Sequence, residues 1–142
     1  MGRVIKTDST GKQRNQLMRT CAEILRHLSQ KQDVDDEVRD MVATLVFSLR
    51  QIDDGIDRSI EAWEKRDYWI KAEQFRTRWT WVSLAADQLT AMIRSDDWQQ
   101  LPAIIMRLYP HFADIKITKL TRKPSTWAGS YARLLREQPD LA

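Results

Sequence analysis

The chain has 142 residues, of which 42% are hydrophobic and 30% charged, with only four glycines and four prolines. This composition excludes a disordered chain, and the scarcity of Gly and Pro disfavours an all-β fold, which needs a turn about every 8–12 residues. The net charge of +3 is unevenly spread: residues 1–31 carry +5, residues 32–64 carry −7, residues 65–98 carry +1 and residues 99–142 carry +4.

Residues 1–10 mix polar residues without a period, so we expect a flexible N-terminus. Apolar residues then recur at helical spacing and predict an amphipathic helix that ends near Lys31; they are Leu17, Cys21, Ile24, Leu25 and Leu28. Cys21 is the only cysteine, which excludes an intrachain disulfide and favours a buried thiol. Residues 32–36 then supply a loop and an N-cap carboxylate for the next helix.

The second predicted helix, from Asp36 to about Lys65, has the clearest pattern in the sequence. Its apolar residues alternate in steps of four and three with one gap, which is a heptad seam: Val38, Val42, Leu45, Leu49, Ile52, Ile56 and Trp63. Gly55 is the only helix breaker inside it and costs about 1 kcal/mol relative to Ala. The helix should therefore be about 45 Å long.

The third predicted helix repeats this alternation without a gap, in Tyr68, Ala72, Phe75, Trp79, Val82, Ala86, Leu89 and Ile93. No Gly or Pro lies in residues 64–67, so we expect either a very tight turn or a kink between the two helices. Two long helices joined by a short link should pack antiparallel, as in a bundle.

A fourth helix is expected to begin at Ser95–Trp98, with a break near Leu108 because Pro110 interrupts its apolar stripe. A basic connection follows, and Ser125 is predicted to cap a short last helix within a C-terminal extension, residues 124–142. We therefore predict one all-α domain: an antiparallel four-helix bundle with a short extra C-terminal helix, spanning residues 1–142.

No catalytic arrangement is recognisable, and we expect a protein that is not an enzyme. With two histidines and one cysteine, the chain cannot assemble an ordinary His/Cys zinc site, and no glycine-rich phosphate loop is present. We expect no metal and no cofactor. No apolar run approaches the roughly 18 residues of a membrane span and the N-terminus has no apolar signal core, so we expect a cytoplasmic protein without membrane contacts.

Basic residues give the main functional indication. A group near the end of the chain and a pair on the third helix are predicted to contact nucleic-acid phosphates, independently of base sequence; they are Lys116, Lys119, Arg122 and Lys123, with Lys71 and Arg78. The alternative is that basic and acidic helices neutralise one another within the bundle. Six tryptophans are many for this length, and Trp69, Trp81 and Trp127 are predicted to serve an oligomer or partner interface, with core filling as the alternative.

The stretch from Ala62 to Trp79, AWEKRDYWIKAEQFRTRW, joins two long helices in a small basic protein. It resembles the accessory variability (Avd-like) proteins of diversity-generating retroelements. The resemblance implies a four-helix bundle that forms a ring-like homo-oligomer, a pentamer, with a basic surface. It also implies a reverse transcriptase partner and RNA or DNA binding during mutagenic retrohoming. The acidic second helix and the segment around Trp127 depart from this pattern.

Two alternatives to the Avd-like function remain. A small helical RNA-binding subunit of an RNA-guided interference complex would also be all-α, basic and of this size. It would associate head to tail and protect RNA. A self-associating bundle with no nucleic-acid role is the other alternative.

Overall fold

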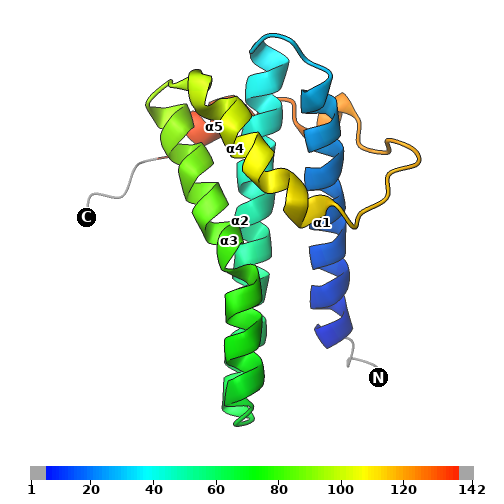
Figure 1. The fold of residues 1–142 in the computed structure, drawn as a ribbon, viewed down its shortest axis with the longest axis vertical. Helices are drawn as coiled ribbons and strands as arrows, with labels where there is room; N and C mark the ends of the chain where they lie inside the picture. The colour runs from blue at the N-terminus through cyan, green and yellow to red at the C-terminus, as the bar shows by residue number, and fades with distance from the viewer. Residues whose placement is uncertain (1–5, 138–142) are drawn as a thin grey trace.

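The computed structural model describes residues 6–137, which form helices joined by turns and loops and contain no strand (Figure 1). The α-helices are α1 (Lys6–Ser29), α2 (Asp36–Lys65), α3 (Trp69–Arg94), α4 (Leu101–Leu108) and α5 (Ser130–Leu135). Three short 3-10 helices accompany them: η2 (Trp98–Gln100), η3 (Tyr109–Phe112) and η4 (Pro124–Thr126). The predicted all-α class is therefore confirmed for the described residues.

The long helices α1, α2 and α3 run in alternating directions, and α2 contacts both of the others (Figure 1). The predicted bounds of α2 are confirmed, including its N-cap: the Oδ1 atom of Asp35 accepts a hydrogen bond from the N–H of Val38 at 2.8 Å. The first helix begins earlier than expected. Residues 6–10, predicted to be flexible, are the first turns of α1, and residues 1–5 lie outside the described part.

The link between α2 and α3 is a tight turn rather than a kink. The N–H of Tyr68 donates to the carbonyl of Trp63 at 2.9 Å, and that of Asp67 donates to the carbonyl of Glu64 at 3.0 Å. These two bonds define a Schellman motif, in which the residue after the C-cap takes a left-handed conformation. Asp67 occupies that position with φ of 62°, where glycine is the usual residue.

The end of α3 repeats the same motif. Asp97 N–H donates to the Met92 carbonyl at 3.0 Å, and Asp96 has φ of 54°. Ser95, predicted to begin the fourth helix, is instead the C-cap of α3. The predicted break near Leu108 is confirmed, since α4 ends there and the chain continues as the 3-10 helix η3.

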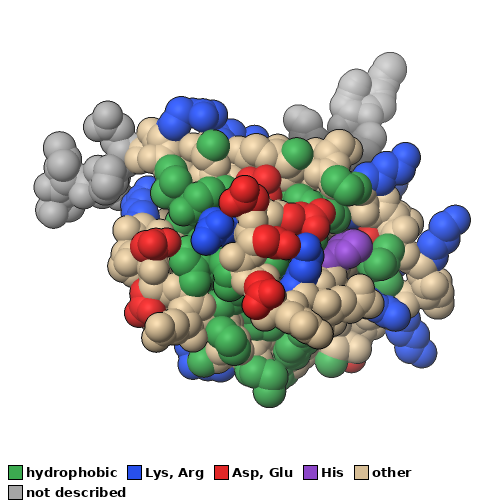
Figure 2. All heavy atoms as spheres, turned by 90° about the horizontal axis from the view of Figure 1, so that it is seen from above, with side chains coloured by type: hydrophobic (Ala, Val, Ile, Leu, Met, Phe, Trp, Pro, Cys, Tyr) green, Lys and Arg blue, Asp and Glu red, His purple; other side chains and the backbone are tan. Residues whose placement is uncertain are grey.

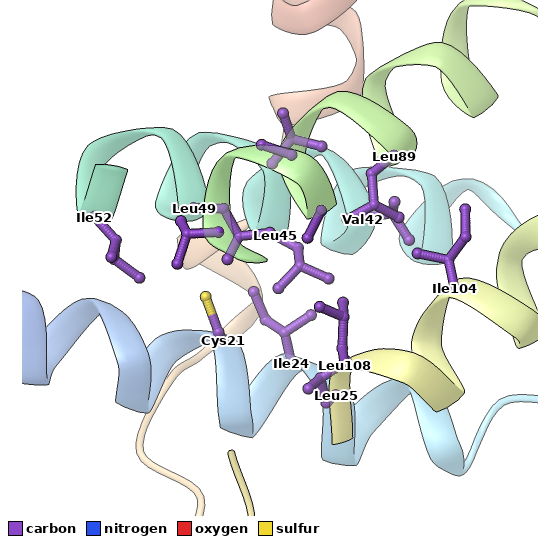
Figure 3. Packing of buried hydrophobic residues seen from close by; sticks show 14 of the residues in the cluster. Cys21, Ile24, Leu25, Val42, Leu45, Leu49, Ile52, Leu89, Ile104 and Leu108 are labelled. Atoms are coloured by element: carbon purple, nitrogen blue, oxygen red, sulfur yellow. The ribbon is translucent and has the colours of Figure 1, made fainter. Parts of the chain in front are cut away.

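The α4 segment crosses obliquely in front of the three long helices, whereas α5 packs on α2 from the opposite side (Figures 1 and 3). The prediction that Ser125 caps the last helix is wrong. Gly129 is the N-cap, with φ of 84°, and the cap acceptor comes from α2. The Asp40 carboxylate accepts the N–H of Gly129 at 3.2 Å and that of Tyr131 at 3.0 Å. A carboxylate distant in sequence therefore replaces the local serine.

The core lies between α1, α2 and α3 and is closed by α4 and by the segment before α5. Cys21 and Ile24 of α1 face Leu45 and Leu49 of α2, with Leu108 of α4 beside them (Figure 3). Cys21 is buried as predicted, and burial raises the pKa of its thiol to about 12. The C-terminal segment contributes Trp127 and Leu134 to the same core, so residues 124–137 are part of the domain rather than an appendage.

The tip of the α2–α3 hairpin extends past the beginning of α1 (Figure 1). Two helices alone cannot enclose every apolar side chain at the tip. Trp69 is 58% exposed and Ile70 is 76% exposed, next to the half-exposed Tyr68. This part of the molecule therefore presents an apolar surface, which we call the hairpin tip: Tyr68, Trp69 and Ile70.

Candidate nucleic-acid interface

Residues 113–123, which we call the connection, have no regular structure and run alongside α1 (Figure 1). One carboxylate, Glu23 of α1, fixes this segment. Its Oε1 atom accepts the N–H groups of Thr121 at 2.7 Å and Arg122 at 2.8 Å. Its Oε2 atom accepts the Thr121 hydroxyl and the Arg19 Nε–H, both at 2.7 Å. One carboxylate of α1 therefore accepts three hydrogen bonds from Thr121 and Arg122 of the connection.

Glu23 is 0% exposed, so it is a fully buried charge. Burial raises the pKa of its carboxyl, but the N–H of Arg122, the Arg19 guanidinium and the Thr121 donors outweigh burial and lower the pKa to about 2. A carboxylate that accepts several hydrogen bonds in its charged form is stabilised in that form. Glu23 is therefore ionised at neutral pH and anchors the connection.

Arginine side chains fasten the connection along the length of α1. Arg19 donates to the carbonyl of Lys119 at 2.7 Å, and Arg26 donates to the carbonyl of Ile117 at 3.1 Å. Arg122 reaches in the other direction and donates to the carbonyl of Gln16 at 3.0 Å. Arg122, predicted to contact nucleic acid, thus uses most of its guanidinium donors in hydrogen bonds within the protein, and it mainly holds the connection against α1.

The lysines of the connection remain available. Lys116, Lys119 and Lys123 are exposed, and none of them forms an ion pair with a residue in the described range 6–137. Residues 115–123 contain four cationic residues and no acidic one. Together with the arginines that fasten it, the connection forms what we call the basic face: Arg19, Arg26, Lys116, Lys119, Arg122 and Lys123.

The other two predicted contacts lie elsewhere, on α3. Lys71 is exposed at the beginning of α3 beside the hairpin tip. The guanidinium of Arg78 lies 5.7 Å from the ring centre of Trp79. In Figure 1 this part of α3 lies low on the α2–α3 hairpin, whereas the connection lies beside the upper part of α1. The structure therefore divides the six predicted residues between two separate surfaces.

The three tryptophans predicted for an interface do not form one surface. Trp69 is exposed at the hairpin tip, as such a role requires. Trp81 is half-buried and stacks on His111, with ring centres 4.0 Å apart. Trp127 is only 2% exposed, packs edge-on against His27 and donates its Nε1–H to Glu37 at 3.2 Å. Its prediction as an interface residue is therefore wrong for this structure, and Trp127 fills the core.

A row of ring contacts links α2, α3 and η3. Trp63 packs edge-on against Phe75, which contacts Trp79, which in turn stacks on Trp81. Arg14 of α1 lies over this row, a contact that the sequence analysis missed. Residue 14 lies seven residues before Cys21 and therefore on the apolar side of α1. This heptad spacing is the sequence signal that could have predicted the contact.

Acidic side chains gather at the opposite end of the molecule from the hairpin tip (Figure 2). They belong to the α1–α2 loop with the start of α2, and to the turn after α3: Asp33, Asp35, Asp36, Glu37, Asp96 and Asp97. Lys31 and Arg39 pair with three of these carboxylates, so this end is less acidic than the carboxylates alone would make it, but it remains unfavourable for a polyanion compared with the connection.

Within residues 6–137, no group of three His, Cys, Asp or Glu side chains is placed to hold a metal ion. None of the helices in that range has the length and apolar character needed to cross a membrane. The chain matches no protein-family model, no curated protein sequence and no solved structure. The function of the chain is therefore inferred from its own sequence and geometry.

Proposed function

We propose that this protein is a non-catalytic binding protein that holds nucleic acid through its basic face. The observation that carries the proposal is the fixed connection, which keeps Lys116, Lys119 and Lys123 exposed without acidic partners among the described residues. Lysines on an anchored segment contact phosphates and release counterions, so binding should depend on salt and not on base sequence.

The more specific proposal is an Avd-like accessory protein that works with a reverse transcriptase in the cytoplasm. It rests on the resemblance of residues 62–79 and on the exposed cations described above. In an antiparallel four-helix bundle of that kind, α4 with its flanking 3-10 turns would be the fourth member. A reverse transcriptase encoded next to this chain, and its co-purification with the chain, would support this role.

Self-association is the second part of the proposal, and the hairpin tip supports it. Exposed Trp and large aliphatic side chains on a protruding element are typical of interfaces. We expect light scattering to give a closed homo-oligomer, such as a pentamer, and Trp69→Ser with Ile70→Ser to give monomers. A wild-type chain that stays monomeric at high concentration would contradict the ring. A series of growing head-to-tail species would favour the interference-complex alternative.

Fluorescence anisotropy with single-stranded RNA and duplex DNA at two salt concentrations tests the nucleic-acid proposal. Replacing Lys116, Lys119 and Lys123 by Gln should weaken binding at least tenfold and reduce the salt slope by about two for single-stranded RNA and about three for duplex DNA. Arg58→Gln, Lys65→Gln and Arg107→Gln together form the matched control, since they remove the same charge from exposed positions elsewhere. Equal losses in both variants, or binding that does not change with salt, would contradict the basic face.

A further inference from the structure

Arg14 occupies an unusual position for a charged residue. It lies one heptad before Cys21, on the side of α1 that faces the hairpin. Its Cζ atom is 5.3 Å from the ring centre of Phe75 and 5.6 Å from that of Trp79. Contact with two aromatic rings from α3 holds the guanidinium in one place, because cation–π contacts and ring packing both favour it.

A second guanidinium shares the same indole. The Cζ atom of Arg78 is 5.7 Å from the ring centre of Trp79, the ring that Arg14 also contacts. Burial and the neighbouring charge of Arg78 lower the pKa of Arg14. Neither arginine pairs with a carboxylate in residues 6–137, whereas Arg76, two residues before Arg78, pairs with both Glu64 and Glu73. The two arginines therefore form a cationic site whose charge is not balanced.

The same cluster also lacks hydrogen-bond acceptors. The Nη1 atom of Arg14 and the Nε1 atom of Trp79 are both buried, and neither has a partner in the described structure. A buried donor without an acceptor costs about 1–3 kcal/mol. Two unpartnered donors, on Arg14 and Trp79, therefore lie beside two positive charges. A ligand with negatively charged acceptor oxygens would satisfy both the donors and the charges.

We propose that Arg14, Arg78 and Trp79 form a second anion site, separate from the basic face, that binds a phosphate group. A phosphate offers several oxygens in a tetrahedral arrangement, so it can accept from two guanidinium groups at once. Arg78 is exposed, so the anion can reach it from solvent, and a shift of the half-buried Arg14 side chain would then bring the buried Nη1 and Nε1 donors to the anion. Lys71, two turns earlier on the same face of α3, would extend the site toward a second phosphate of a phosphodiester chain.

The first test uses inorganic phosphate alone, in the variant that lacks Lys116, Lys119 and Lys123, so its outcome does not depend on the basic face. At constant ionic strength, replacing chloride by phosphate at about ten times its Kd should raise Tm by about 3–5 °C. Arg78→Gln should weaken phosphate binding at least tenfold, and Arg76→Gln should leave it unchanged. No shift, or the same shift in both variants, would overturn the proposal.

Two further measurements identify the anion and its source. Phosphate should move the indole N–H resonance of Trp79, assigned with Trp79→Phe, in proton–nitrogen correlation spectra. Acetate that produces the same shift at the same concentration would mean a carboxylate site for a protein partner and would overturn the phosphate assignment. A short oligouridylate that binds this variant more tightly than inorganic phosphate, and loses that advantage in Lys71→Gln, would identify nucleic acid as the source of the phosphate.

Discussion

The connection and the segment that follows it both pack against the long helices, but they are held by different forces. The connection is fixed by hydrogen bonds and charge at Glu23, in addition to the partly buried Ile115 and Ile117, which pack against the core. The segment from residue 124 to 137 is fixed by the burial of Trp127 and Leu134, assisted by the Asp40 carboxylate. The attachment of the connection thus depends in part on the charge of one buried carboxylate, so its stability should depend on protonation.

The largest effect on stability is expected at Trp127, the buried side chain that holds the segment from residue 124 to 137. Trp127→Ala should lower the free energy of unfolding by about 3–5 kcal/mol, because a buried indole leaves a cavity. Trp127→Phe keeps most of the ring and loses mainly the hydrogen bond to Glu37, so it should cost clearly less. Urea denaturation at neutral pH measures both. A loss below about 1 kcal/mol for Ala would mean that the segment is not part of the core.

The contribution of Glu23, which holds the connection, should instead depend on pH. The folded-state pKa of Glu23, about 2, lies below the usual glutamate value of 4.5, so its contribution to stability is complete above pH 4.5 and disappears as the pH falls toward 2. The difference corresponds to roughly 3 kcal/mol. Glu23→Gln should lose a comparable amount at neutral pH and flatten this part of the stability profile. Denaturation at several pH values measures it, and an unchanged profile in Glu23→Gln would exclude Glu23 as the cause.

The smallest effect on stability is expected at Asp67 and Asp96, the aspartates with positive φ in the turns that end α2 and α3. Asp67→Gly should stabilise the protein by about 0.5–1 kcal/mol, because glycine adopts a positive φ without strain. Asp96→Gly should gain less or nothing, because the Asp96 carboxylate also accepts the Nε1–H of Trp98 at 3.0 Å. Thermal denaturation of the two variants measures the difference. A larger gain at Asp96 would contradict this assignment.

Much of the helical arrangement could be predicted because it follows from apolar spacing. The heptad pattern placed α2 within a residue of its observed bounds, and Pro110 marked the break after α4. The cap of α5 could not be predicted, since its acceptor, Asp40, lies about 90 residues away. Periodicity reports which side of a helix is apolar, and it carries no information on long-range polar pairs.

The candidate site was predictable in its charge but not in its geometry. The cluster of lysines in the connection is visible in the sequence, and their exposure agrees with the expected role. That Arg122 would turn back to α1 depends on Glu23, which looks like an ordinary solvated charge in the sequence. Trp127 was misassigned for a similar reason, because composition does not reveal which tryptophans the C-terminal segment buries.

Glu23 is held by main-chain N–H groups of the connection as well as by the side chains of Thr121 and Arg19. Main-chain groups are present whatever the side chain, except at proline. Substitutions at the neighbouring lysines should therefore change the surface charge without releasing the segment. During evolution, or in the laboratory, the connection could acquire a new binding preference while the rest of the fold stays unchanged.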